Sequence, residues 1–317
     1  MNYEQSSVGS FQTWKLLDET LKDRLMRQIR VWWGLSPGSH KGAQYFPGPQ
    51  PVSVERKDFD TLRNENYWVS YKSDGVRFLM VFIKIDDRSY CFLMNRKMDC
   101  HLVKMTAATR LFESGTVLDG EIVEDRNTKQ SEYIVYDATI VCGRSLVKEP
   151  HSARLESAMT VANHVRVSSV PVKIKLFYPL RDFRDYVQDV VGTITHGIDG
   201  YIFTPENSPV CSGTHFKMFK WKEQISNTVD FHVEYHHKRR RWVLKVSRGK
   251  SLIETDDQVI GVDRTQRFPC IMECKYAGPK TWTPVLIRED KTHPNNYLTY
   301  TKTLLNISEN ITLEEFY

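Results

Sequence analysis

A strand-rich run from about residue 67 to residue 140 constrains the fold of this chain more than any other feature. Its apolar stretches are separated by turns near residues 74–75, 86–87, 115 and 125–127. The apolar stretches 67–71 and 76–85 are typical of strands, and the sequence Lys-Ser-Asp-Gly-Val-Arg joins them at residues 72–77. This pattern predicts antiparallel sheets and places Lys72 at a strand end beside a glycine turn, where its amine can attack a phosphate.

Helical periodicity flanks this run. Leucine and isoleucine residues spaced four apart predict an amphipathic helix over residues 14–33. Two more helices and two more strands are expected downstream, the helices near 152–164 and 180–191 and the strands at 173–178 and 200–204.

The pattern changes after residue 221. Five short alternating segments follow, at residues 231–235, 242–246, 258–262, 271–276 and 283–288. Five short strands over about seventy residues are typical of a small Greek-key barrel of the OB type. We therefore expect an α+β protein with two domains: a larger one over residues 1–226, to which 305–317 returns, and an OB-fold β-barrel over 227–304.

The composition is that of an ordinary soluble globular protein, with 40% apolar and 26% charged residues. The net charge is 44 − 39 = +5, which permits an RNA partner without requiring one. No apolar stretch approaches the roughly 20 residues of a membrane span, and no signal peptide is visible. The six cysteines lack zinc-site spacing and are expected to be reduced and mostly buried, which predicts an intracellular protein.

Five further patches combine acidic, aromatic or basic residues with strand-like sequence. They are residues 118–122 (LDGEI), 133–137 (YIVYD), 198–202 (IDGYI), 218–222 (MFKWK) and 287–295 (IREDKTHPN). Each has a structural alternative when taken alone. The Asp-Gly pairs are common in hairpin turns, Asp137 can cap a turn, Tyr136 can belong to a core, and Lys175 can be a solvated surface lysine.

In this order the six patches resemble motifs I, III, IIIa, IV, V and VI of the covalent nucleotidyltransferases. That superfamily comprises messenger-RNA capping guanylyltransferases and ATP-dependent polynucleotide ligases. Three features resemble the capping branch: the sequence Gln-Pro-Val-Ser at 50–53, the aromatic and apolar 219–222, and the ending of the patch at 288–295. The resemblance covers about residues 46–306, and the compact length is most similar to the stand-alone enzymes of large DNA viruses.

The resemblance implies a nucleotide cleft between antiparallel sheets of the larger domain. It also implies an mRNA guanylyltransferase that transfers GMP from GTP, through a covalent lysyl-N-GMP intermediate on Lys72, to the 5′-diphosphate end of RNA, forming the GpppN cap. An attacking lysine must be unprotonated, which nearby cations and partial desolvation favour. Lys220 and Lys222 are expected to supply that positive charge.

The remaining site residues follow from the same resemblance. Arg77 and Glu121 are expected at the ribose and the phosphate region, and Asp199 is expected to hold Mg²⁺ or Mn²⁺, because hard cations prefer carboxylates. Tyr136 and Ile202 are expected to flank the base. Lys175 matches a lysine that donates to guanine O6, where adenine has a donor of its own. The residues expected to bind GTP from the second domain are Arg288, Asp290 and Lys291.

The expected partners are GTP and diphosphate-ended RNA, with RNA triphosphatase and cap methyltransferase as separate proteins and no membrane. Nucleus and cytoplasmic viral factory are equally compatible locations. One alternative is an ATP-dependent polynucleotide ligase with a lysyl-AMP intermediate, and another is a catalytically inactive, RNA-binding regulatory subunit. The basic run 238–241 is either an RNA contact or an exposed hairpin tip.

Overall fold

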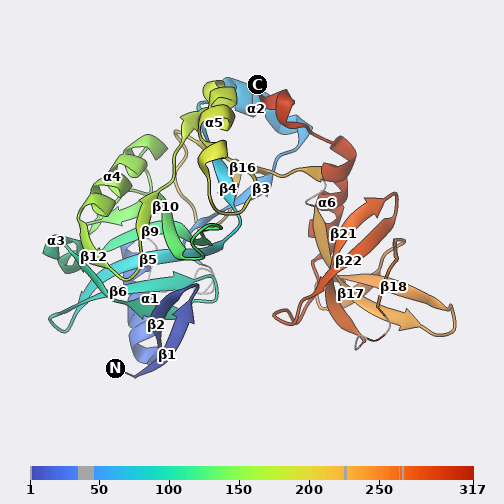
Figure 1. The fold of residues 1–317 in the computed structure, drawn as a ribbon, viewed down its shortest axis with the longest axis horizontal. Helices are drawn as coiled ribbons and strands as arrows, with labels where there is room; N and C mark the ends of the chain where they lie inside the picture. Colours follow the sequence, from blue (N-terminus) through green and yellow to red (C-terminus); the bar gives the residue numbers. More distant parts are fainter. Residues whose placement is uncertain (1, 35–45, 225–226, 264, 266–267) are drawn as a thin grey trace. The chain divides into compact units, whose positions relative to one another are not determined.

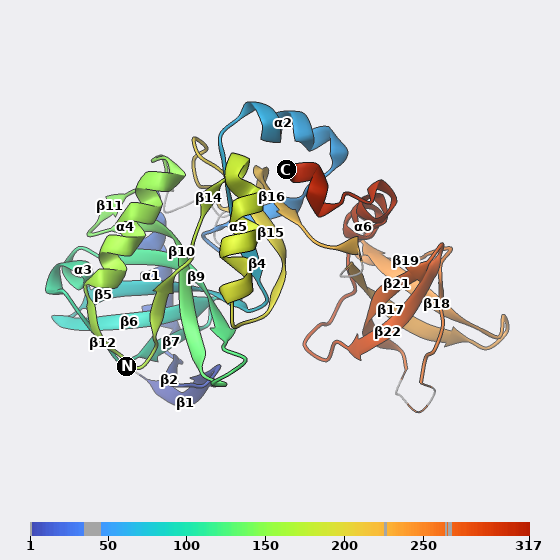
Figure 2. The same ribbon diagram turned by 45° about the horizontal axis from the view of Figure 1, so that its top comes forward.

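The computed structural model describes residues 2–34, 46–224, 227–263, 265 and 268–317 of the chain (Figures 1 and 2). It divides into two compact units. The first contains Met1–Val52, Asp60–Lys220 and Tyr317, and the second contains Ser53–Phe59 and Trp221–Phe316. The architecture is α+β and mostly sheet, as expected from the sequence.

The boundaries differ from the expected ones at three places. The second unit begins at Trp221 instead of residue 227, residues 305–316 belong to it instead of returning to the first unit, and Ser53–Phe59 belongs to it as well. The reason is packing, because Tyr300 and Ile307 of the C-terminal helix are buried in the core of the second unit. Arg56 joins the same unit through hydrogen bonds to Glu309 and Glu315.

In the described residues up to Trp221, the elements are sixteen strands, five α-helices and three short 3₁₀ turns. The strands are β1 (Tyr3–Val8), β2 (Phe11–Leu16), β3 (Pro49–Ser53), β4 (Tyr67–Ser73), β5 (Val76–Ile85), β6 (Arg88–Asn95), β7 (Cys100–Val103), β8 (Met105–Ala107), β9 (Thr116–Glu124), β10 (Ser131–Val141), β11 (Arg144–Ser145), β12 (Val165–Ser168), β13 (Val172–Ile174), β14 (Tyr178–Pro179), β15 (Ile198–Pro205) and β16 (Gly213–Trp221). The helices are α1 (Glu19–Trp32), α2 (Phe59–Asn64), α3 (Thr109–Glu113), α4 (His151–Asn163) and α5 (Phe183–Asp189), with 3₁₀ turns at Arg56–Asp58, Leu180–Asp182 and Val191–Thr193.

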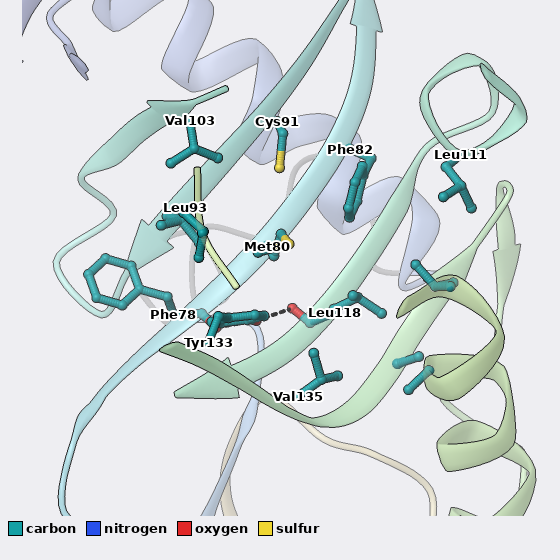
Figure 3. Packing of buried hydrophobic residues seen from close by; sticks show 14 of the residues in the cluster. Phe78, Met80, Phe82, Cys91, Leu93, Val103, Leu111, Leu118, Tyr133 and Val135 are labelled. Carbon is teal, nitrogen blue, oxygen red and sulfur yellow. Dashed lines mark hydrogen bonds between the residues drawn. The ribbon is translucent and has the colours of Figure 1, made fainter. Parts of the chain in front are cut away.

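A nine-stranded sheet forms the centre of the first unit, in the order β1-β2-β7-β6-β5-β9-β10-β11, with β13 also paired to β10. Both of its faces are buried. Along β5, Phe78, Met80 and Phe82 pack on the face that α4 covers (Figure 3), whereas Leu79 and Val81 pack on the face that α1 covers. This double burial explains why β5 is an unbroken apolar run in the sequence.

A five-stranded sheet, β14-β4-β15-β16-β3, forms the other layer of the first unit. The chain leaves this sheet at Ser73 and enters the nine-stranded sheet at Val76, so residues 72–77 connect two sheets and do not form a hairpin. Gly75 is required at this crossing, because an added Cβ would lie 2.4 Å from the carbonyl oxygen of Ile122.

The second unit is built on a six-stranded sheet in the order β19-β18-β17-β21-β22-β20. Among its described residues, the outermost strands β19 and β20 do not pair with each other, so the expected closed barrel is not shown. Its elements are β17 (Thr228–His236), β18 (Arg241–Arg248), β19 (Ser251–Glu254), β20 (Gln258–Val259), β21 (Cys270–Gly278), β22 (Thr281–Ile287), α6 (Tyr297–Glu309) and a 3₁₀ turn at Leu313–Phe316.

Two local predictions were wrong. Residues 14–16 belong to β2, and the helix begins only after Asp18, whose carboxylate accepts a hydrogen bond from the Leu21 amide. The strand expected at 173–178 is broken into β13 and β14, which leaves Lys175 in the gap between them.

All six cysteines are free, as expected, and Cys91, Cys100 and Cys274 are buried. None of the described helices combines the length and the apolar composition that a bilayer crossing requires.

Candidate active site

A cavity of about 130 Å³ lies in the first unit, and both of its sheets contribute to the lining. Its walls are mixed, with cationic, acidic and aromatic side chains beside apolar ones. The lining residues are Pro49, Pro51, Ser70, Lys72, Ser73, Arg77, Arg96, Asp119, Glu121, Tyr136, Asp137, His151, Lys175, Phe177, Ile202, Thr204 and Met218.

Lys72 reaches the cavity from the end of β4, and its ammonium donates a 2.7 Å hydrogen bond to Oδ1 of Asp199. The pairing of β4 with β15 explains this contact. The register shifts between Ile198 and Tyr201, so Asp199 and Gly200 form a bulge opposite Lys72. Bulges commonly re-aim side chains beside active sites, and this one turns a carboxylate toward the amine. Both side chains are half-buried.

Arg77 forms the buried centre of the site. Its Nε donates to Oδ1 of Asp119 at 2.9 Å, and its Nη2 donates to the other carboxylate oxygen. Its Nη1 donates to the carbonyl oxygen of Pro49, and its guanidinium lies 5.8 Å from the ring centroid of Tyr136. Burial lowers the pKa of Arg77, but the charge and hydrogen bonds of Asp119, together with Tyr136 and Glu121, raise it overall. The hydroxyl of Tyr136 also donates to Asp119, so this carboxylate fixes both side chains.

Lys175 is a second amine in the cavity wall, and only 3% of it is exposed. Its Nζ donates to Oγ of Ser73 at 2.8 Å and to the carbonyl oxygen of Tyr71 at 3.2 Å. Burial lowers the pKa of Lys175 to about 8, and the charge of Lys72 contributes to the decrease. Burial also raises the pKa of Glu121, against the attraction of Lys175, Lys72 and Arg77.

The other expected site residues of the first unit lie at or near this cavity. Ile202 lines it from β15, opposite Ser70 of β4. Met218 of β16 lines the cavity, whereas Lys220 is not among the lining residues. Residues two apart lie on the same face of a strand, so Lys220 lies on the same face of β16 as Met218. Lys222 follows the end of β16 and belongs to the second unit.

Arg288, Asp290 and Lys291 also belong to the second unit, and there they form an ion-pair cluster. The guanidinium of Arg288 makes two 2.9 Å hydrogen bonds to Asp290, and its Nη1 lies 3.1 Å from Oδ1 of the buried Asp230. Lys291 pairs with the same Asp230 carboxylate. Asp290 is therefore paired with Arg288, and the GTP contact expected for it stays a prediction.

Sequence reasoning did not assign roles to several polar groups of the site. Asp119 was placed in the patch 118–122 but given no role of its own, although its spacing from Glu121 places both on one face of β9. Asp137 forms a buried ion pair with Arg154 of α4, with 2.8 Å from Nε to Oδ1. His151, the first residue of α4, lines the cavity without any sequence signal for it.

Residues 238–240 of the basic run lie in the turn between β17 and β18, and Arg241 begins β18, as the hairpin-tip interpretation predicts. Arg239 and Arg241 each form a 2.7 Å ion pair with Glu254. An RNA contact by this turn stays a prediction.

Comparison with known proteins identifies the family. The profile described as "mRNA capping enzyme, catalytic domain" matches residues 13–224, and that described as "mRNA capping enzyme, C-terminal domain" matches residues 214–317. These matches define a covalent nucleotidyltransferase with its C-terminal domain. More narrowly, the chain belongs to the mRNA capping enzyme family.

The relatives include proteins named mRNA-capping enzyme subunit alpha in two yeasts. The protein of Schizosaccharomyces pombe is 26% identical and aligns with 93% of this chain and 82% of its own length. The protein of Saccharomyces cerevisiae is 32% identical and aligns with 61% of this chain and 49% of its own length. The mRNA-capping enzyme of Danio rerio is 26% identical over 85% of this chain and 48% of its own length. The chain thus spans about half the length of the latter two relatives. The expected likeness to viral enzymes stays a prediction.

Among solved structures, one described as mycobacterial DNA ligase D complexed with ATP and MES aligns with 77% of this chain and 96% of its own length. It is 15% identical, with a TM-score of 0.43, which is too low to support an inference.

Proposed function

We propose that this chain is the guanylyltransferase of mRNA capping and that Lys72 is its nucleophile. The observation that carries the proposal is the position of Lys72, whose half-buried amine lines the cavity from the end of β4. The amine must lose a proton before it attacks, and its hydrogen bond to Asp199 holds it in place. Arg77, Lys175 and Glu121 surround the same cavity, which is the charge pattern that a nucleoside triphosphate requires.

The proposed reaction has two steps. In the first, Nζ of Lys72 forms a bond to the α-phosphorus of GTP, and the bond from that phosphorus to the bridging oxygen breaks, which releases pyrophosphate. In the second, a terminal oxygen of diphosphate-ended RNA attacks the same phosphorus, and the N–P bond breaks. The lysine is regenerated and the product is the GpppN cap. Arg288 and Lys291 are predicted to act on the leaving phosphates, and Lys220 and Lys222 to neutralise phosphate charge.

Replacing Lys175 by alanine should narrow a preference for GTP over ATP. We expect Lys175 to donate to guanine O6, whereas the amino group of adenine would leave this buried donor unpaired. An unpaired buried donor costs about 1–3 kcal/mol, so the wild type should prefer GTP by at least about ten-fold. Adduct formation is measured with each labelled nucleotide in turn. Equal labelling of the wild type by ATP would favour the ligase alternative.

Removal of divalent metal should stop adduct formation, with Asp199 among the metal ligands. Within the described ranges, no group of three or more His, Cys, Asp or Glu side chains is placed to hold a metal ion by itself. Asp199 and Glu121 nevertheless fit Mg²⁺ or Mn²⁺, because such ions take one or two carboxylates and complete their shell with phosphate oxygens and water. The bound ion would offset the charge of the triphosphate.

The test of this site is Asp199→Asn, which keeps the shape of the side chain and removes its charge. The variant should require a higher metal concentration for half-maximal adduct formation. Glu206→Gln is a matched control, because Glu206 follows the same strand but binds Trp68 and Ser152. A metal titration identical to that of the wild type would remove Asp199 from the metal site.

The names of the yeast relatives, which call each an alpha subunit, support a partner protein for this chain. We infer that RNA triphosphatase and cap methyltransferase act as separate proteins, and that capping takes place in the nucleus or in a cytoplasmic viral factory.

A further inference from the structure

His151 is a buried polar group of the cavity that the proposed reaction does not use. It is 1% exposed, and it lines the cavity from the first position of α4. Its ring packs edge-on against Phe177, with 4.7 Å between the ring centroids. Its Nε2 is buried and has no hydrogen-bond partner among the described residues. A buried polar atom without a partner costs free energy, so this one requires an explanation.

The tautomer of His151 follows from its neighbour. Nη2 of Arg154 lies 3.3 Å from Nδ1 of His151, and a guanidinium can only donate, so Nδ1 must accept. Burial lowers the pKa of His151 to about 4, and the ring is therefore neutral at pH 7. A neutral imidazole that accepts at Nδ1 carries its proton at Nε2. The orphaned atom is thus a hydrogen-bond donor at the cavity wall. Arg154 in turn donates two hydrogen bonds to Asp137, which fixes the guanidinium that contacts the His151 ring.

Two donor side chains therefore line the same cavity as Tyr136. Nζ of Lys175 lies 5.3 Å from the ring centroid of Tyr136. His151 lines the cavity beside Phe177, whose ring it contacts. Guanine presents two neighbouring acceptors, O6 and N7, on one edge, whereas adenine presents N7 beside an amino donor.

We propose that His151 is a base-recognition residue whose Nε2–H donates to N7 of guanine, while Lys175 donates to O6. The inference rests on the proposed function and adds a second donor to it. Loss of the N7 acceptor leaves the His151 donor buried without a partner when the base is bound. A nucleotide that lacks N7 should therefore be used less well, by a factor on the order of ten.

The experiment compares GTP with 7-deaza-GTP, in which a CH group replaces N7, and measures kcat and KM of adduct formation. The wild type should lose about ten-fold in kcat/KM with 7-deaza-GTP, mostly through KM, because the bond forms on binding. His151→Phe keeps the ring and removes the donor, and should use both nucleotides equally. His151→Gln keeps an N–H donor and should restore part of the discrimination.

His196→Phe is the matched control. His196 is also buried with an orphaned Nε2, but it does not line the cavity, so its variant should discriminate as the wild type does. Damage to the fold would lower both rates together and leave their ratio unchanged. Equal use of the two nucleotides by the wild type would overturn the role of His151, as would full discrimination by His151→Phe. Absence of any GMP adduct in the wild type would instead overturn the proposed function.

Discussion

Replacing Lys72 by alanine or by arginine should abolish the covalent GMP adduct. Alanine removes the nucleophile, and arginine cannot replace it because a guanidinium stays protonated. The adduct is detected with α-labelled GTP on a denaturing gel. It should be labile in acid and stable in alkali, as expected of a phosphoramidate. A labelled band that persists in Lys72→Ala would rule out Lys72 as the nucleophile.

Two other lysine variants serve as controls for the labelling test. Lys175→Met removes the other amine of the cavity, and we expect it to retain a weaker but detectable adduct. Lys217→Ala removes a lysine of β16 that is ion-paired with Glu65 on the surface, and it should label like the wild type.

Replacing Asp119 by alanine should lower the free energy of unfolding of the first unit by about 3–5 kcal/mol, because it leaves the Arg77 guanidinium buried without its counterion. Asp119 is 1% exposed and Arg77 is 9% exposed, so the ion pair is shielded from bulk solvent. The variant also loses the hydrogen bond from Tyr136, which should displace the base platform and weaken adduct formation. Denaturant unfolding followed by tryptophan fluorescence measures the loss.

Glu65→Ala is the matched control for this prediction. It breaks the exposed ion pair with Lys217, and such pairs contribute about 1 kcal/mol or less. If Asp119→Ala were as stable as Glu65→Ala, the Arg77–Asp119 pair would not be the buried centre of the site.

The sequence predicts the motifs well because their chemistry fixes residue types at short spacing. Lys72 and Asp199 were both predicted, and the β15 bulge brings them within 2.7 Å. Asp119 was given no role of its own, and the alternative weighed for the Asp119-Gly120 pair was a hairpin turn. Here β9 continues through Gly120, where a Cβ would lie 2.7 Å from the carbonyl oxygen of Ile134. Strand pairing across the sheet, and not the local sequence, decides that position.

Other features depend on tertiary packing in the same way. The strand expected at 173–178 ends early because only residues 172–174 pair with β10, and Lys175 then turns into the cavity. His151 has no charge pattern or motif that marks it. Helix α6 was not predicted, although the sequence carries its signal. Tyr300, Leu304 and Ile307 have helical spacing, and Asn296 caps the first turn.

The most direct test of the central claim maps the adduct on the wild-type protein. The chain is incubated with Mg²⁺ and either GTP or ATP, digested at alkaline pH, and sequenced by mass spectrometry. The cavity contains two amines, Lys72 and Lys175, and the lowered pKa of Lys175 makes it the chemical competitor. We expect GMP on Lys72 and little or no AMP. GMP on Lys175, or AMP on Lys72 at an equal level, would contradict this expectation.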